Sequence, residues 1–440
     1  MKRVKKPALI LALAATFSHH STVVHAAPGL VDVYQMALQH DAQLAQAQAS
    51  YEANQQIMSQ AKSLLLPQIS ASAGLNQIDS SNDANTGNLQ EIAVSLQQPL
   101  FNREAFSRYD QAKYQLEEAH ITFRLAQQNL MVRTSEAYFN VLLAEQSLRL
   151  ATSKEAADKI QWEKAQASAD VGLASRTDVL QARSSYDLSI SDRISAENNL
   201  DVAYEQLMKL TGQPLTALKQ LMLQVKLPSL ALDKTALELK AEADNLTVRI
   251  SQQRGQVAAE EIEAQKSAHW FNVNLQAQYV DRTYSGYSGT SAPTDRQDTT
   301  IGVQVSLPLY SGGRTSAQVA EARFNSQAAN IAVRDAREQA RLDARIQARN
   351  LERGYALVEA LREAVKSSEA FLEAAEEGYR VGLRNMLDVL TARANLFQAQ
   401  RNLAEALHNL VLTQLRLQST LGELNIDHLR QLDMLLSNPN

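Results

Sequence analysis

The stretch VGLRNMLDVL at residues 381–390 decides the fold, because a near copy of it occurs earlier in the chain. Residues 171–180 read VGLASRTDVL, at an offset of 210 residues, and the match continues without a gap. Between 171–213 and 381–423, 13 of 43 positions are identical. Usual residue frequencies would give about a third of that or less by chance. The chain is therefore a tandem duplication, and each copy of the stretch reads as a glycine turn that restarts a helix.

Residues 1–26 have the pattern of a secretory signal peptide. Four basic residues within 2–6 precede a short apolar run at 8–17, and small residues surround the end at Ala26. The formal net charge of −5 becomes more negative when this leader is removed. A nucleic-acid partner is not expected for so acidic a protein.

Composition narrows the class of protein further. The chain has no cysteine, which excludes disulfides, thiolate metal sites and a lipid anchor on an N-terminal cysteine. Only 15 glycines and 9 prolines occur in 440 residues, a balance that favours long helices. No phosphate-binding loop, nucleophile motif or metal-ligand spacing of histidines is visible, so neither an enzyme nor a cofactor is predicted.

Each half of the chain predicts the same succession of elements. The first repeat, 27–212, has a helix over 30–63, a β-hairpin over 67–100 and long helices that turn near Gly172. Pro99 is expected to end the second strand of that hairpin. The second repeat, 241–422, has a helix, a hairpin over 270–310 with a loop expected over 281–298, and long helices that turn near Gly382. We interpret 213–240 as a connector and 423–440 as a C-terminal tail.

The two hairpins alternate apolar and polar residues over strands of roughly ten residues, a pattern typical of transmembrane β-barrels. In 271–279, for example, Phe271, Val273 and Leu275 alternate with Asn272 and Asn274. The alternative is a soluble hairpin with one face on a core. Four strands cannot close a barrel, and open edges are not stable in lipid. Cyclic symmetry then favours about twelve strands pooled from three chains.

The helices are the second unusual feature. A helix of about 65 residues is about 100 Å long, more than a bilayer and comparable to the depth of a periplasm. A coiled-coil seam follows steps of four and three along one predicted helix. Its members are Leu403, Leu407, Leu410, Gln414, Leu417 and Leu421. An ordinary antiparallel coiled coil is one interpretation, and a helical cylinder that continues the β-barrel is the other, which the hairpins favour.

The repeated VGL and DVL turns, the duplicated hairpins and the helix ends at Gly212 and Gly422 resemble the TolC family of outer-membrane channel-tunnels. The resemblance covers the whole mature chain and is to the non-lipidated branch. It implies an α+β membrane protein: a trimeric twelve-stranded β-barrel, an α-helical coiled-coil barrel in the periplasm of a Gram-negative bacterium, and an equatorial belt. It also implies an export duct for type I protein secretion or multidrug efflux, working with a periplasmic adaptor and an inner-membrane ABC or proton-driven transporter.

The resemblance also implies positions for a gate and for adaptor docking. In the family, polar ties near the helix tips hold the second-repeat coil shut against the first. The matching residues here are Gln161, Thr177, Asp178, Glu376, Tyr379 and Arg384. Adaptor hairpins bind at the turns, which here are Val171, Gly172, Leu173, Val381, Gly382 and Leu383. The alternative for the gate residues is a set of solvated helix-end charges, worth under about 1 kcal/mol each.

Asp388 is implied to project into the pore, where three copies would form a carboxylate ring that attracts cations. The family has a second aspartate one turn further on, and the residue at that position here is Thr391. This departure predicts a less cation-selective entrance. A periplasmic coiled-coil stalk without a pore is the alternative function, and neither the cargo nor the identity of the partners follows from the sequence.

Overall fold

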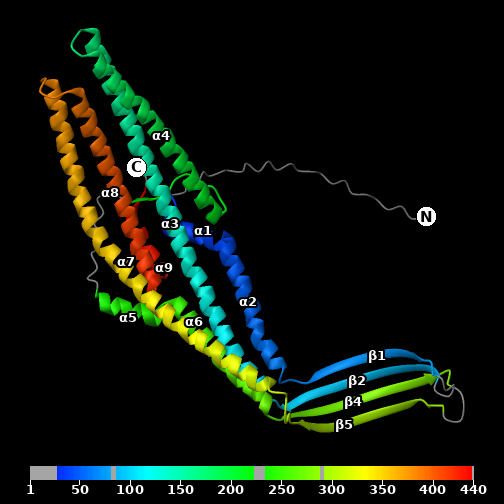
Figure 1. Ribbon diagram of the computed structural model, residues 1–440. Helices are drawn as coiled ribbons and strands as arrows, with labels where there is room; N and C mark the ends of the chain where they lie inside the picture. The colour runs from blue at the N-terminus through cyan, green and yellow to red at the C-terminus, as the bar shows by residue number, and fades with distance from the viewer. Residues whose placement is uncertain (1–26, 81–85, 222–232, 288–291, 439–440) are drawn as a thin grey trace, which may run out of the picture.

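The computed structural model describes residues 27–80, 86–221, 233–287 and 292–438, so the predicted signal peptide lies outside the described residues. The described chain is elongated (Figure 1). Four strands lie at one end, and paired helices extend away from them to two separate tips at the other. Within the described residues, no helix combines the length and the apolar composition that crossing a membrane requires.

The strands form one antiparallel sheet in the order β1-β2-β4-β5. Their bounds are β1 Gln68–Ile78, β2 Gly87–Phe101, β4 Asn272–Ser285 and β5 Arg296–Ser306. Antiparallel pairing between β2 and β4 connects the β-hairpin of the first repeat to that of the second. In the described part of the chain, the outer edges of β1 and β5 pair with no other strand.

The two hairpins lie close to their predicted bounds, but strands within them extend further than the sequence suggested. The expectation that Pro99 ends its strand is wrong, because β2 continues to Phe101 through an irregularity in register beside the proline. Proline lacks a donor for the ladder, and a local bulge accommodates that loss. Strands β4 and β5 also extend into 281–298, which the sequence suggested was a loop.

The register separates the sheet into an apolar and a polar face, since residues paired across antiparallel strands lie on the same side. One row of such pairs runs through Ile69, Leu96, Ala277 and Ile301. Its outermost members, Ile69 and Ile301, are 70% and 73% exposed. The opposite face carries side-chain hydrogen bonds between polar residues, such as the 2.7 Å bond between the hydroxyls of Ser70 and Ser95.

Two long helices, α3 (Arg103–Asp170) and α7 (Arg314–Arg380), organise the rest of the molecule. Near the sheet they pack with α2 (Ala42–Ser63) and α6 (Leu246–Lys266), and towards the tips with α4 (Arg176–Thr211) and α8 (Met386–Thr420). The packing order α2-α3-α6-α7 repeats the strand order, because each helix joins the strand that it lies above. The helical layer therefore continues the sheet.

The seam predicted on α8 is buried against α7. Leu403, Leu407, Leu410, Leu417 and Leu421 belong to one apolar cluster, whereas Gln414 is half-buried. The cluster includes small residues of α7, among them Ala340 and Ala344. Small side chains let two helix backbones approach closely, so the coiled-coil prediction for this pair is confirmed.

Two predicted helices are each divided by a polar cap. The helix over 30–63 consists of α1 (Leu30–His40) and α2, separated by Asp41. The Asp41 carboxylate accepts the Leu44 N–H at 2.7 Å and pairs with Arg133 at 2.9 Å. Asn245 separates α5 (Lys234–Asp244) from α6 in the same way. Both side chains satisfy backbone donors that a new helix N-terminus leaves without partners.

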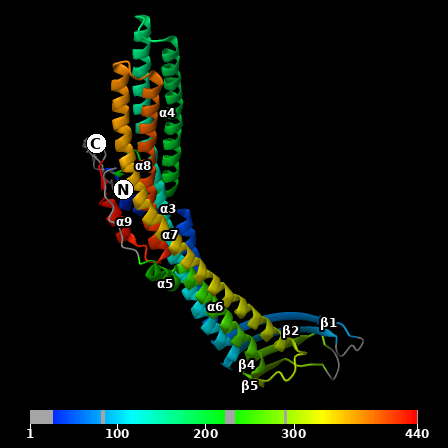
Figure 2. The ribbon, with the colours of Figure 1, turned by 60° about the vertical axis from the view of Figure 1, so that its left-hand side comes forward.

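The predicted connector and tail meet beside the middle of the long helices, near α9 (Ile426–Asp433) in Figure 2. Strand β3 (Gln220–Leu221) pairs with β6 (Leu436–Ser437). Residue 240, where we placed the end of the connector, lies inside α5, and 222–232 lie outside the described residues. The buried Tyr138 hydroxyl donates to the Lys219 carbonyl at 2.7 Å, which fixes this region to α3.

His408 on α8 predicts a pH dependence of stability. It is buried, Nδ1 lies 2.7 Å from the Ala404 carbonyl oxygen, and Nε2 has no hydrogen-bond partner among the described residues. Burial lowers the pKa of His408 below its ordinary value of 6.5, so the unfolded chain binds the proton more readily. Its contribution to stability is therefore complete above pH 6.5. As the pH falls from there to the pKa of the folded state, stability is lost at about 1.4 kcal/mol for each pH unit.

We expect His408→Phe to flatten this dependence. The measurement is thermal unfolding between neutral and acidic pH, and equal slopes for the variant and the parent protein would contradict the assignment. His120→Phe is the control, because the His120 side chain is exposed on α3.

Candidate functional site

The two VGL turns form the tips of the molecule. Gly172 and Gly382 adopt left-handed backbone angles, with φ of 78° and 75°, which side chains on Cβ disfavour. The next N–H in each turn closes on the preceding helix: Leu173 donates to the Ser168 carbonyl and Leu383 to the Gly378 carbonyl, each at 2.8 Å. The sequence repeat is therefore also a repeat of turn geometry.

An aspartate begins the helix after each turn. Asp178 forms a capping box with Ser175, whose hydroxyl donates to the carboxylate at 2.7 Å. Asp388 forms the equivalent box with Asn385. Reciprocal caps satisfy two backbone donors and place negative charge at the positive end of the helix. Both aspartates thus have a local structural role, besides any role of Asp178 in the gate or of Asp388 in the pore.

The tips expose apolar side chains. Leu173 and Leu383 are each 83% exposed, and Val171 and Val381 are also largely exposed. Large apolar side chains on rigid, polar-rimmed turns are typical of protein interaction sites. The structure therefore exposes all four side chains at the turns where the family resemblance implies docking.

Two of the predicted gate residues lie around the second turn, and a third lies just after the first turn. Tyr379 is half-buried, and burial together with the charge of Asp178 raises the pKa of its hydroxyl. Arg384 lies 3.9 Å from the Asp388 carboxylate, and its stem packs so closely on Gly378 that an added Cβ there would lie 2.7 Å from Arg384 Cγ. Thr177 is exposed at the start of α4.

Two further predicted gate residues, Gln161 and Glu376, each contact other residues within one protomer. Gln161 is buried, and its Nε2 lies 3.0 Å from the sulfur of Met386. Glu376 accepts a hydrogen bond of 2.7 Å from Arg393. The Gln161 contact joins α3 to α8 and so links the two helical hairpins, whereas the Glu376 contact joins α7 to α8 within the second-repeat hairpin.

Arg393 is the central residue of a buried ionic cluster that sequence reasoning missed. Arg393 and Asp158 are only 8% and 2% exposed, and their charged groups lie 3.7 Å apart. Arg393 also donates to the Ala157 carbonyl at 3.0 Å. On the other side of Asp158 lie Lys154 at 3.6 Å and the Ser185 hydroxyl at 3.1 Å.

This cluster joins all four helices of the half of the molecule that carries the tips. Asp158 belongs to α3, Ser185 to α4, Glu376 to α7 and Arg393 to α8. Arg183, the counterpart of Arg393 in the first repeat, is exposed instead. It pairs with Asp187 at 3.7 Å and lies over the Trp162 ring. The repeat alone gave no signal to distinguish the two arginines, because only their packing differs.

The two predicted pore positions lie one turn apart at the start of α8. Asp388 is half-buried and Thr391 is exposed. The Asp388 carboxylate faces the Arg384 guanidinium as well as its own helix cap. Among the described residues, no group of His, Asp and Glu side chains is arranged to hold a metal ion.

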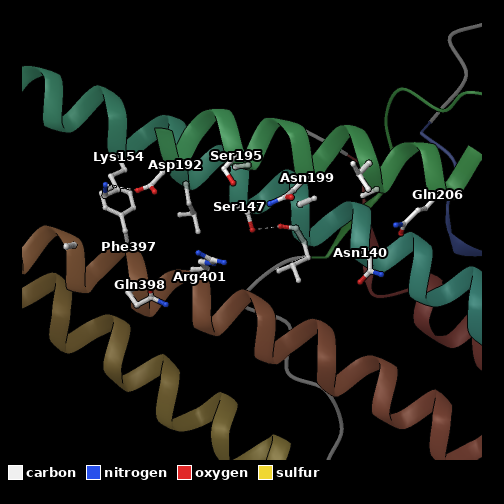
Figure 3. Close-up of a pocket in the computed structure, with 18 residues that line it drawn as sticks. Asn140, Ser147, Lys154, Asp192, Ser195, Asn199, Gln206, Phe397, Gln398 and Arg401 are labelled. Atoms are coloured by element: carbon white, nitrogen blue, oxygen red, sulfur yellow. Dashed lines mark hydrogen bonds and ion pairs between the residues drawn. The ribbon is translucent and has the colours of Figure 1, made fainter. Parts of the chain in front are cut away.

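A groove of about 760 Å³ lies between α3, α4 and α8 (Figure 3). Figure 3 shows Lys154 and Asp192, an ion pair of 3.2 Å, on one side and Phe397, Gln398 and Arg401 of α8 on the other. Lys154 also belongs to the buried cluster, so the groove and the cluster are adjacent. The helical hairpin of the first repeat therefore packs closely on that of the second at Arg393, whereas the adjacent groove separates them.

The duplicated fold with this pair of tips defines an outer-membrane export channel. A family model described as "Outer membrane efflux protein" matches residues 33–213 and 239–423, and the chain belongs to that family. The two matched segments correspond to the two repeats. This confirms the resemblance seen in the sequence, and the family has a transport role rather than an enzymatic one.

Among the relatives is the outer membrane protein TolC of Escherichia coli (strain K12), which is 30% identical over 94% of this chain and 86% of its own length. The alkaline protease secretion protein AprF of Pseudomonas aeruginosa is 28% identical over 90% of this chain and 85% of its own. A solved structure of CusC superposes with a TM-score of 0.78 at 16% identity, covering 90% of this chain and 92% of that one. The last comparison supports the fold alone.

Proposed function

We propose that three copies of this chain form one duct through the outer membrane and the periplasm. The observation that carries the proposal is the shared order of strands and helices, with outer edges of β1 and β5 that are unpaired among the described residues. Three copies joined edge to edge would close the sheet and the helical layer above it together. The first repeat is 27–212 and the second 241–422, with 213–240 and 423–440 forming the belt.

The duct would work with a periplasmic adaptor and an inner-membrane transporter, in type I protein secretion, multidrug efflux or both. The relatives support this range, since one is named for secretion of an alkaline protease and the family for efflux. Planar-bilayer recording of the purified trimer is the test. Discrete channel openings are expected, whereas a bilayer that stays silent at all protein concentrations would favour a periplasmic stalk without a pore.

The gate in this proposal comprises Gln161, Thr177, Asp178, Glu376, Tyr379 and Arg384, supplemented by the Arg393 cluster. Tyr379 and Asp178 lie on different hairpins and influence each other electrostatically. Contacts that combine charge with hydrogen bonds are strong but can be exchanged when a partner binds. The buried cluster would hold the two hairpins together, and the exposed residues at the turns would respond to the partner.

Asp388 is proposed to line the narrowest part of the pore, with Thr391 one turn away. We expect Asp388→Asn to lower cation selectivity and Thr391→Asp to raise it, because each change removes or adds three carboxylates around the threefold axis. The permeability ratio of K⁺ to Cl⁻, obtained from reversal potentials in a salt gradient, should change by about twofold or more in opposite directions. Changes in the same direction would place both residues outside the pore.

The two turns are proposed as the adaptor-docking surface: Val171, Gly172, Leu173, Val381, Gly382 and Leu383. We expect Leu173→Asp and Leu383→Asp to weaken adaptor binding by about tenfold or more each, because a charge replaces an apolar contact that binding would bury. Leu173→Ile is the control and should bind normally. Binding of detergent-solubilised trimer to an immobilised adaptor is the measurement, and unchanged affinity in both aspartate variants would remove the turns from the interface.

A further inference from the structure

A network of four charged side chains crosses the sheet at its end away from the helices. Arg282 on β4 donates to Glu91 on β2 at 2.7 Å and to Asp298 on β5 at 3.0 Å. Arg296 lies 3.2 Å from the same Asp298 carboxylate. The network was not predicted, because the sequence pattern suggested a loop at Arg282, Arg296 and Asp298.

Register shows which face of the sheet carries the network. Glu91 pairs directly with Arg282, and Arg282 with Arg296. On its own strand, each of these residues is separated from Leu96, Ala277 or Ile301 of the apolar row by an odd number of positions. Because successive side chains on a strand alternate between faces, an odd separation places two residues on opposite faces of the sheet. The network therefore lies on the polar face. When the apolar face contacts lipid, the network faces the lumen of the barrel.

The position of the network along the barrel axis follows from the residues on the outer, lipid-facing side of the sheet. On β4 the apolar positions of the outer face end at Tyr279, and the next position outward is Asp281, which pairs with Ile92 of β2 and whose carboxylate accepts from Gln297 at 3.1 Å. A charged residue on the outer face marks the end of the lipid-facing band. Arg282 follows Asp281 directly, so the network lies at the outer mouth of the duct.

The four charges cancel within one protomer. Arg282 and Arg296 offset Glu91 and Asp298, and three copies would make a ring of mixed sign at the mouth. The nearby Asp295 accepts the Tyr284 N–H at 2.7 Å and lies beyond the network. A ring of like charges would favour counterions and exclude ions of its own sign, because rings of charge decide selectivity in pores. Cancelled charge removes that preference.

We propose that Arg282 sets the charge selectivity of the outer mouth, keeping it neutral so that cargo of either sign can leave the duct. This inference rests on the proposed duct function. Among the residues that the structure describes, Arg282 is the one arginine that contacts both carboxylates of the network. Its loss leaves Glu91 without its partner and gives each protomer a net negative charge at this level. Loss of Glu91 would instead give each protomer a net positive charge at this level.

The test compares Arg282→Gln and Glu91→Gln in planar bilayers under a KCl gradient. We expect the K⁺ to Cl⁻ permeability ratio to rise by about twofold or more in Arg282→Gln and to fall in Glu91→Gln. Asp281→Asn is the matched control. It removes a charge at the neighbouring position but on the lipid-side face, so the ratio should stay at its parental value.

A third variant distinguishes an effect of charge from an effect of misfolding. Arg282→Gln combined with Glu91→Gln loses the contact between β2 and β4 but restores charge balance, and it should have nearly the parental permeability ratio. Shifts in the same direction for the two single variants, or none, in channels that conduct would overturn the role of Arg282. A parent protein without conductance would instead overturn the duct itself.

Discussion

Replacing Ile301 by arginine is expected to prevent the protein from accumulating in the outer membrane. Ile301 is 73% exposed in one chain and lies within the apolar row of the sheet. An arginine near the middle of the lipid-facing band costs about 2–4 kcal/mol. A trimer carries that cost three times, which is comparable to the whole stability of many folded domains.

Thr300→Arg is the matched control, because Thr300 is the neighbouring residue on the polar face, where it pairs with Gln278. We expect this variant to assemble and to differ only in conductance. The measurement is the amount of SDS-resistant trimer in outer-membrane fractions. Equal amounts of trimer for the two variants would show that the apolar face does not contact lipid.

Arg393→Met is expected to loosen the joint between the two helical hairpins and to raise single-channel conductance. Removing one partner of a buried ion pair leaves the other charge buried, which typically costs about 3–5 kcal/mol. Here the remaining charge is Asp158, with Lys154 at 3.6 Å as its nearest other cation. If the closed state depends on the cluster, the free-energy difference that favours it over the open state should decrease.

Arg183→Met tests the same chemistry at the equivalent position of the first repeat. Its ion pair with Asp187 is largely exposed, and exposed pairs contribute about 0–1 kcal/mol, so conductance should scarcely change. Adding Asp158→Asn to Arg393→Met should restore part of the stability, because the isolated buried charge is then removed. Equal conductance in the Arg393 and Arg183 variants would exclude the cluster from the gate.

The sequence predicted most of the architecture because its signals are periodic and occur twice. The repeat offset located both turns, alternation located both hairpins, and the leucine steps of α8 located a buried seam. Family membership and the channel fold are confirmed. The predicted gate, pore and docking roles stay predictions, since they depend on contacts between protomers or with partners.

What the sequence could not predict depends on single polar residues within periodic stretches. Asp41 and Asn245 divide helices because their side chains cap a new helix start, although the apolar pattern continues past them. Arg282 lies in a strand because Glu91 and Asp298 pair with it from both sides. Arg393 is buried only because α8 packs against α3 beside Asp158, a tertiary contact that no local pattern encodes.

The most direct test of the central claim is the number of chains in the particle purified from the outer membrane, measured by native mass spectrometry after gentle removal of detergent. In the part of the chain that the structure describes, the large sheet has four strands and two unpaired edges, and we predict a particle of three chains. A particle of one or two chains in a functional preparation would contradict the account, because the sheet would then have no way to close in lipid.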